Sequence, residues 1–129
     1  MALATAIGCA RRNPADVGTP FRFDDAGATT QSDYTGSVPK IEIRRAGEGW
    51  LLTAYQGRQS TGGYSIRIER LATTGTILHV KARFVVPAAD AVVTLAPTSP
   101  AHTVRLPFFP DAVVLYDQDG NERYQATLP

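Results

Sequence analysis

Residues 77–86 of the chain read ILHVKARFVV, and this stretch decides the fold class. Its apolar residues occupy every second position, the spacing of side chains that share one face of a β-strand: Leu78, Val80, Ala82 and Phe84. The residues between them, His79, Lys81 and Arg83, would face solvent. We therefore expect a strand here, with His79 as an exposed strand residue rather than a catalytic base.

The same alternation recurs along the chain between frequent turn signals. Further candidate strands cover residues 40–45, 50–55, 64–69, 102–106, 112–116 and 123–128, with a very short alternation at 21–23 and a short apolar run at 91–95. Residues 24–37 collect Asp, Gly, Ala, Thr and Ser and are expected to form a loop. The chain is therefore predicted to be all-β. It would form a single small β-sandwich or partly open barrel of about seven to nine short antiparallel strands.

The composition is ordinary for one globular domain, with 129 residues, 43% hydrophobic and 19% charged. The formal net charge of +1 hides an uneven distribution, because residues 40–83 carry a net charge of +5. These charges fall at alternating positions, which favours the solvated face of a sheet over a nucleic-acid site. No apolar stretch is long enough for a membrane-spanning helix.

The start of the chain predicts a tether rather than part of the fold. Residues 1–18 are small and polar, so we expect a flexible leader there and a single all-β domain over residues 19–129. The one cysteine, Cys9, excludes an internal disulfide. It follows Ala6-Ile7-Gly8, which resembles the end of a bacterial lipoprotein signal, although Ala6 replaces the usual Leu. Cys9 is either a lipidation site or an inert thiol in the leader.

Residues that would support catalysis or metal binding do not gather in any recognisable pattern. The two histidines, His79 and His102, are far apart in the sequence, and His102 is expected in a loop-to-strand junction with a hydrogen bond. A metal site needs three or four convergent ligands. The stretch 117–121 superficially resembles a calcium loop, but Leu128 occupies the position that requires a bidentate Glu. We expect no catalytic residues, no metal and no cofactor.

The segment GRQSTGGY at residues 57–64 places two adjacent glycines at the entrance of a strand. Glycine adopts positive φ without a steric penalty, so the chain can reverse tightly here. Glycine also leaves main-chain N–H and C=O groups uncovered, which would let another backbone approach. Tyr64 shares parity with Ile66 and Ile68, and its ring is expected to cap the edge of the core.

This segment and those that follow resemble the C-terminal domain of PrcB. The resemblance covers residues 50–107 and rests on the order of GRQSTGGYSI at 57–66, an apolar strand at 78–84, Pro87, Thr98-Ser99-Pro100 and an apolar strand at 104–106. It implies an accessory, non-catalytic subunit that helps to assemble or stabilise a protease complex in the bacterial envelope or outside the cell. The partner would be a protein, with a peptidase as the candidate.

The resemblance and the bare glycine backbone together predict a partner-binding surface. The residues expected to form it are Gly57, Thr61, Gly62, Gly63, Tyr64, Thr98, Ser99 and Pro100. The same glycine pair is also compatible with a simple hairpin or bulge that binds nothing.

Two further functions stay open. Chagasin-type inhibitors of cysteine peptidases present a similar Thr-Thr-Gly-Tyr loop, although Ser65 and Ile66 depart from their pattern and no Arg-Pro-Trp segment is present. An OB-like barrel that binds single-stranded nucleic acid would use the basic middle of the chain. No nucleic-acid partner is expected in the preferred interpretation.

Overall fold

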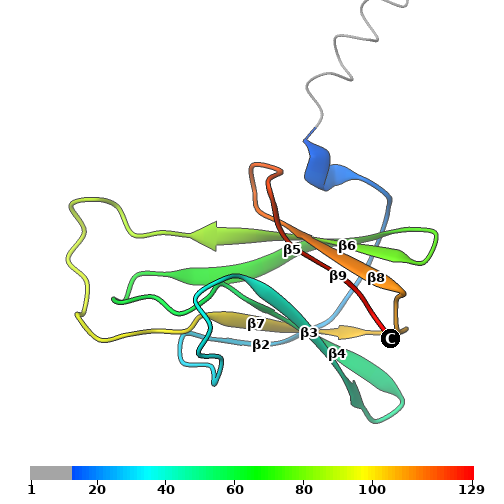
Figure 1. The fold of residues 1–129 in the computed structure, drawn as a ribbon, viewed down its shortest axis with the longest axis horizontal. Coiled ribbons are helices and arrows are strands. Elements are labelled where there is room, and N and C mark those ends of the chain that lie inside the picture. Colours follow the sequence, from blue (N-terminus) through cyan, green and yellow to red (C-terminus); the bar gives the residue numbers. More distant parts are fainter. Residues whose placement is uncertain (1–12) are drawn as a thin grey trace, which may run out of the picture.

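The computed structural model describes residues 13–129, which fold into nine strands arranged in two sheets (Figure 1). The strands are β1 (Thr19–Phe21), β2 (Asp25–Thr29), β3 (Lys40–Ala46), β4 (Gly49–Tyr55), β5 (Ser65–Thr74), β6 (Ile77–Val85), β7 (Ala101–Leu106), β8 (Ala112–Tyr116) and β9 (Glu122–Thr127). A short 3₁₀ helix, η1 (Pro14–Asp16), precedes them. The prediction of a small all-β sandwich is confirmed.

The two sheets are formed by different sets of strands and are not closed into a barrel. One sheet has the order β1-β5-β6-β8-β9, and the other has the order β2-β7-β4-β3. The described residues therefore form a sandwich and not the barrel of an OB fold. The paired strands are antiparallel except β6 and β8, which are parallel. The expectation of an entirely antiparallel sandwich is wrong at this pair, because the chain visits the other sheet through β7 before it returns as β8.

The inward-facing residues of both sheets form one hydrophobic core. It includes Ile41, Leu52, Ala54, Ile66, Ile68, Leu71, Leu78, Val80, Ala82, Phe84, Val104, Leu106, Val113 and Leu115. The apolar set of β6 that was predicted from alternation is buried as expected. Burial of such a side chain contributes about 1.5–3 kcal/mol, so this core is the main source of stability.

Three local features differ from the sequence prediction. Residues 24–37 were expected to be a loop but include β2, all of whose residues are exposed. The strand predicted at residues 64–69 continues to Thr74 through a bulge between Ile68 and Arg70. The apolar run 91–95 belongs to no strand.

Both histidines are buried. His79 was expected to be exposed, but only 9% of it is accessible, because the ring stacks on Tyr116 and contacts the Thr74 hydroxyl at 3.1 Å. Burial lowers the pKa of His79, and the nearby Arg70 lowers it further. His102 is hydrogen bonded as expected, but it lies inside β7 and not at a loop junction.

Residues 13–18, which were assigned to the leader, contact the five-stranded sheet. Arg70 donates from Nη1 to the Val17 carbonyl at 2.7 Å, and Lys81 pairs with Asp16 at 3.0 Å. Ala15 is buried. Cys9 and residues 1–12 lie outside the described part of the chain. None of the described helices is long and apolar enough to cross a membrane.

Candidate functional site

The segment that was predicted to bind a partner lies at one end of the sandwich. We call residues 57–64 the glycine loop, residues 98–100 the anchor segment and residues 86–97 the projecting loop. The glycine loop connects β4 to β5, and the other two segments connect β6 to β7. Figure 1 shows that the projecting loop extends beyond the ends of both sheets.

Gly57 begins the glycine loop in a conformation that requires glycine. Its φ is +103°, and a Cβ at this position would lie 2.7 Å from the Ser37 carbonyl oxygen. The next residue, Arg58, donates its N–H to the Gly36 carbonyl at 2.8 Å. Gly57 is therefore a buried crossing point between two loops and not a partner contact.

Thr98 binds the glycine loop through three hydrogen bonds. Its N–H donates to the Gln59 carbonyl at 2.9 Å, and the Gln59 N–H donates to the Thr98 carbonyl at 2.8 Å. Its hydroxyl donates to the Thr61 carbonyl at 2.8 Å. The glycine loop and the anchor segment, which were predicted to be neighbours, are thus in direct contact in the structure.

Ser99 holds a different loop, residues 30–34. Its N–H donates to the Thr30 carbonyl at 2.7 Å, and its hydroxyl donates to the Tyr34 carbonyl at 2.7 Å. Its own carbonyl accepts the Ser32 N–H at 2.9 Å. The carbonyl of Pro100 accepts the Gln56 N–H at 3.0 Å.

The anchor segment is buried, which corrects its predicted role. Thr98 is 8% exposed, Ser99 is 6% exposed and Pro100 is fully buried. A partner could not reach these side chains in this structure. They fix the positions of the surrounding loops instead.

The glycine pair receives the projecting loop. The Gly62 N–H donates to the Thr94 carbonyl at 3.0 Å, and the Gly62 carbonyl accepts the Thr61 hydroxyl at 3.0 Å. Gly63 has a φ of +90°, and a Cβ there would lie 2.8 Å from the Pro87 Cβ. The expectation of uncovered main chain is therefore wrong at Gly62, whose N–H and C=O are both bonded within the chain. The two glycines are required because another segment packs directly on them.

The projecting loop exposes apolar side chains that the sequence did not single out as binding residues. Val92 is fully exposed, Leu95 is 86% exposed and Val86 is 63% exposed. Asp90 is the only charged residue of the loop. Among the hydrogen bonds of residues 13–129, only that from Gly62 to Thr94 joins this loop to another part of the chain. The sequence feature that could have indicated this exposed loop is an apolar run without strand periodicity between Pro87 and Pro97.

Gln56 leaves an unsatisfied acceptor at the base of the projecting loop. Its side chain is 5% exposed, and its Nε2 donates to the carbonyl of Val85 at 3.1 Å, where β6 ends and the loop begins. Its Oε1 is the only buried side-chain N or O atom of the described residues without a hydrogen-bond partner. Such atoms are rare in folded proteins and mark sites that a water or a ligand completes.

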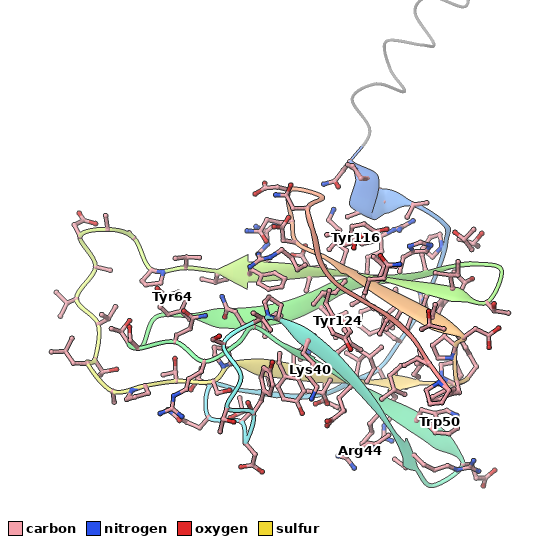
Figure 2. All side chains as sticks on the ribbon, viewed as in Figure 1. Lys40, Arg44, Trp50, Tyr64, Tyr116 and Tyr124 are labelled. Carbon is pink, nitrogen blue, oxygen red and sulfur yellow. The ribbon has the colours of Figure 1, made fainter. Side chains whose placement is uncertain are left out.

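The aromatic residues do not supply an exposed anchor near the glycine loop. Figure 2 shows Trp50 and Tyr64 at opposite ends of the molecule. Trp50 stacks on Phe109 with a centroid distance of 4.7 Å, and Tyr55 packs on Tyr34 at 5.0 Å. Tyr64 is partly buried beside the glycine pair. Exposed apolar area at this end therefore comes mainly from the projecting loop.

The described residues hold no cluster of three or more side chains that could bind a metal ion. No curated protein and no solved structure matches the chain. The family model described as PrcB C-terminal matches residues 51–107, a range that begins in β4 and ends just after β7. This central segment of the chain is therefore a PrcB C-terminal match, as predicted from the sequence, and it suggests a protease-associated accessory domain.

Proposed function

We propose that this protein is a non-catalytic module that binds another protein through its projecting loop, and that it thereby assembles or stabilises a protease complex of the bacterial envelope. The observation that carries the proposal is the exposure of Val86, Val92 and Leu95 on a loop that rests on the glycine pair. The family match supports the accessory role.

Exposed apolar side chains that lie together are a common feature of protein interfaces. Each of Val92 and Leu95 would contribute about 1.5–3 kcal/mol if a partner buried it fully. The glycine loop and the anchor segment hold the two ends of the projecting loop, which limits the entropy lost on binding. The mechanism is shape complementarity between this loop and an apolar recess of the partner.

The predicted site residues take two roles in this proposal. Gly62, Gly63 and Thr98 position the projecting loop, whereas Val92 and Leu95 contact the partner. Thr61 and Tyr64 line the support beneath. The Gln56 Oε1 has no hydrogen-bond partner in the described residues. In this proposal it accepts a hydrogen bond from the partner when the projecting loop moves aside.

The location of the protein in the cell is part of the same proposal. Cys9 would carry a lipid anchor, and the chain after it would connect the domain to the membrane surface. Export would place the protein where secreted peptidase complexes work. A mass measurement of the protein from its native cells, before and after hydrolysis of ester-linked and amide-linked acyl groups, tests lipidation directly.

The partner can be identified by site-specific photo-crosslinking in the native cells. A benzophenone amino acid at Val92 is expected to capture a peptidase or a subunit bound to one, and the same probe at Glu48 is not. Glu48 is an exposed residue of the turn between β3 and β4 and is a matched surface control. Capture of the same proteins from both positions, or of no peptidase-associated protein from Val92, would contradict the proposal.

The captured partner then allows a quantitative test. Val92→Asp and Leu95→Asp are each expected to weaken its affinity at least about tenfold, or about 1.4 kcal/mol, because a carboxylate would be buried in an apolar recess. Peptidase turnover measured in the same mixtures separates the two protein-binding functions. Unchanged or increased turnover supports the accessory role, and stoichiometric loss of turnover would assign an inhibitor instead.

A further inference from the structure

A groove of about 580 Å³ lies on the outer face of the four-stranded sheet, and no residue of the projecting loop lines it. Its volume is within the range of about 300–1,000 Å³ that is typical of ligand sites. Strand β3 forms one side, β4 and β7 form the floor, and the loop 32–35 closes one end. Figure 2 shows Lys40 and Arg44 on β3. Neither the predicted site residues nor the proposed function uses this groove.

The floor is formed by small side chains from the two central strands. Thr53 and Thr103 lie opposite each other in the β4–β7 register, and their hydroxyls are 2.8 Å apart. Ala101 continues the floor towards Thr29 of β2. Because the main-chain groups of central strands are used in the sheet, this floor offers a ligand side-chain hydroxyls and not backbone pairs.

The wall beside the floor is held by a network of side chains. The Tyr55 hydroxyl donates to Glu42 Oε1 at 3.2 Å, and Lys40 Nζ lies 3.7 Å from Glu42 Oε2. Lys40 also lies 5.1 Å from the ring centroid of Tyr34, which packs on Tyr55. Burial raises the pKa of Tyr55, and the charge of Glu42 adds to this effect, so the hydroxyl remains a donor at neutral pH. The side chains of the wall therefore contact one another along β3 and β4.

The end of the groove is fixed by the anchor segment. Ser99 bonds to Thr30, Ser32 and Tyr34, as described above, and these bonds hold the loop that carries Asp33. Asp33 and Arg44 line the groove, and neither has an ion-pair partner among residues 13–129. An anionic and a cationic group are thus free at the rim to bond to a ligand.

The chemistry of the lining excludes several classes of ligand. An apolar ligand would desolvate the charged groups without compensation. A phosphate-rich ligand would meet the carboxylates of Asp33 and Glu42. An extended peptide binds best along a free strand edge through its main chain, and the floor lies inside the sheet. A ligand with many hydroxyls can donate to carboxylates and accept from Lys40 and Arg44, and hydrogen bonds to charged groups contribute about 1.5–3 kcal/mol.

We propose that this groove binds a neutral oligosaccharide. The sugar hydroxyls would bond to Asp33, Glu42 and Arg44, and one sugar face would lie on the Thr53 and Thr103 floor. This site is independent of the projecting loop, so a protein and a glycan could be bound at the same time.

The test is a titration of the ¹⁵N-labelled protein with triacetylchitotriose and with maltotriose, followed by two-dimensional NMR. At least one saccharide is expected to shift the amide signals of residues that line the groove, with saturation below about 10 mM. Arg44→Ala should weaken this binding at least fivefold. Arg105→Ala is the matched control, because Arg105 is an exposed arginine of the same sheet that does not line the groove.

Three results would overturn the proposal. The first is the absence of saturable shifts in the groove with both saccharides. The second is equal weakening by Arg44→Ala and Arg105→Ala. The third is a larger response of the same signals to inorganic phosphate or to an unrelated decapeptide at the same concentration, which would assign another ligand class. Thermal unfolding of each variant verifies that the fold is retained.

Discussion

The anchor segment and the projecting loop adjoin in the sequence but differ in almost every physical respect. Thr98 and Ser99 are buried and each makes several hydrogen bonds to other loops. The twelve preceding residues expose Val92 and Leu95, and one hydrogen bond joins them to another segment. A buried, well-bonded support therefore carries an exposed apolar loop, an arrangement common in binding proteins.

This contrast changes the meaning of the family motif. The residues that carry the resemblance, Gly62, Gly63 and Thr98, contact other loops of the chain, and in the proposed function they support the contact surface and do not form it. A motif of this kind fixes where a loop projects, whereas the side chains on that loop decide what it meets. In the proposed function, the family match marks the support of the projecting loop, and the partner is sought through the loop itself.

The largest expected change in stability comes from a substitution in the glycine loop, which supports the projecting loop. Gly57→Ala should lower the free energy of unfolding by roughly 3–5 kcal/mol, because a Cβ would meet the Ser37 carbonyl and the backbone would be strained at positive φ. Urea unfolding followed by circular dichroism measures the loss. Gly47→Ala is the control, since Gly47 also has positive φ but a Cβ there meets nothing within 4 Å. Equal losses in the two variants would show that Gly57 serves only as a turn residue.

The second largest effect is expected from a disulfide that joins the projecting loop to the glycine loop. A Cβ on Gly62 would lie 2.5 Å from the Thr94 hydroxyl, which Thr94→Cys removes, and 3.8 Å from the Thr94 Cβ, a separation that suits a disulfide. Gly62→Cys with Thr94→Cys, in a Cys9→Ser background, should raise the free energy of unfolding by about 3 kcal/mol when oxidised. Unfolding with and without a reductant measures this gain. Partner affinity should persist in the oxidised form; its loss would show that binding requires the loop to leave the glycine pair.

The fold could be predicted largely from alternation, and its exceptions have physical causes. Strands such as β6 can be predicted from the sequence because one face is apolar and buried and the other is polar. Strand β2 lacks this pattern, since all of its residues are exposed and it exists only because its backbone pairs with β7. His79 does lie on the face of β6 opposite the core, as predicted. Its ring is nevertheless buried by Tyr116 and Thr74, and this burial depends on tertiary packing.

The candidate site could be predicted in position but not in detail. The resemblance to the PrcB C-terminal domain placed Thr98 near the glycine loop, and the structure joins the two segments by hydrogen bonds. Burial of the anchor segment could not be foreseen, because Thr98 and Ser99 are polar and their partners lie in distant loops. Val92 and Leu95 belong to a short apolar run that was predicted as a candidate strand, and no segment of residues 13–129 covers them.

A smaller effect, the pH dependence of stability, tests whether β6 is buried near His79. This strand leads into the exposed projecting loop after Val85. Burial lowers the pKa of His79 from 6.5, so the unfolded chain binds more protons in the window just below that value. The free energy of unfolding should therefore fall by a fraction of a kcal/mol as the pH drops from 7 through this window. His79→Gln should flatten the profile. An unchanged slope would mean that His79 is not protected from water.

The smallest expected effect lies on the loop itself. Val92→Ser and Leu95→Ser should change the free energy of unfolding by less than about 0.5 kcal/mol, because exposed side chains that contact nothing contribute little to folding. Chemical unfolding of each variant provides the value, and Leu52→Ser in the core gives the opposite extreme. A loss above 1 kcal/mol would place Val92 or Leu95 in a packed cluster and remove it from the interface. A residue whose replacement spares folding but abolishes capture of the partner has no role left except recognition.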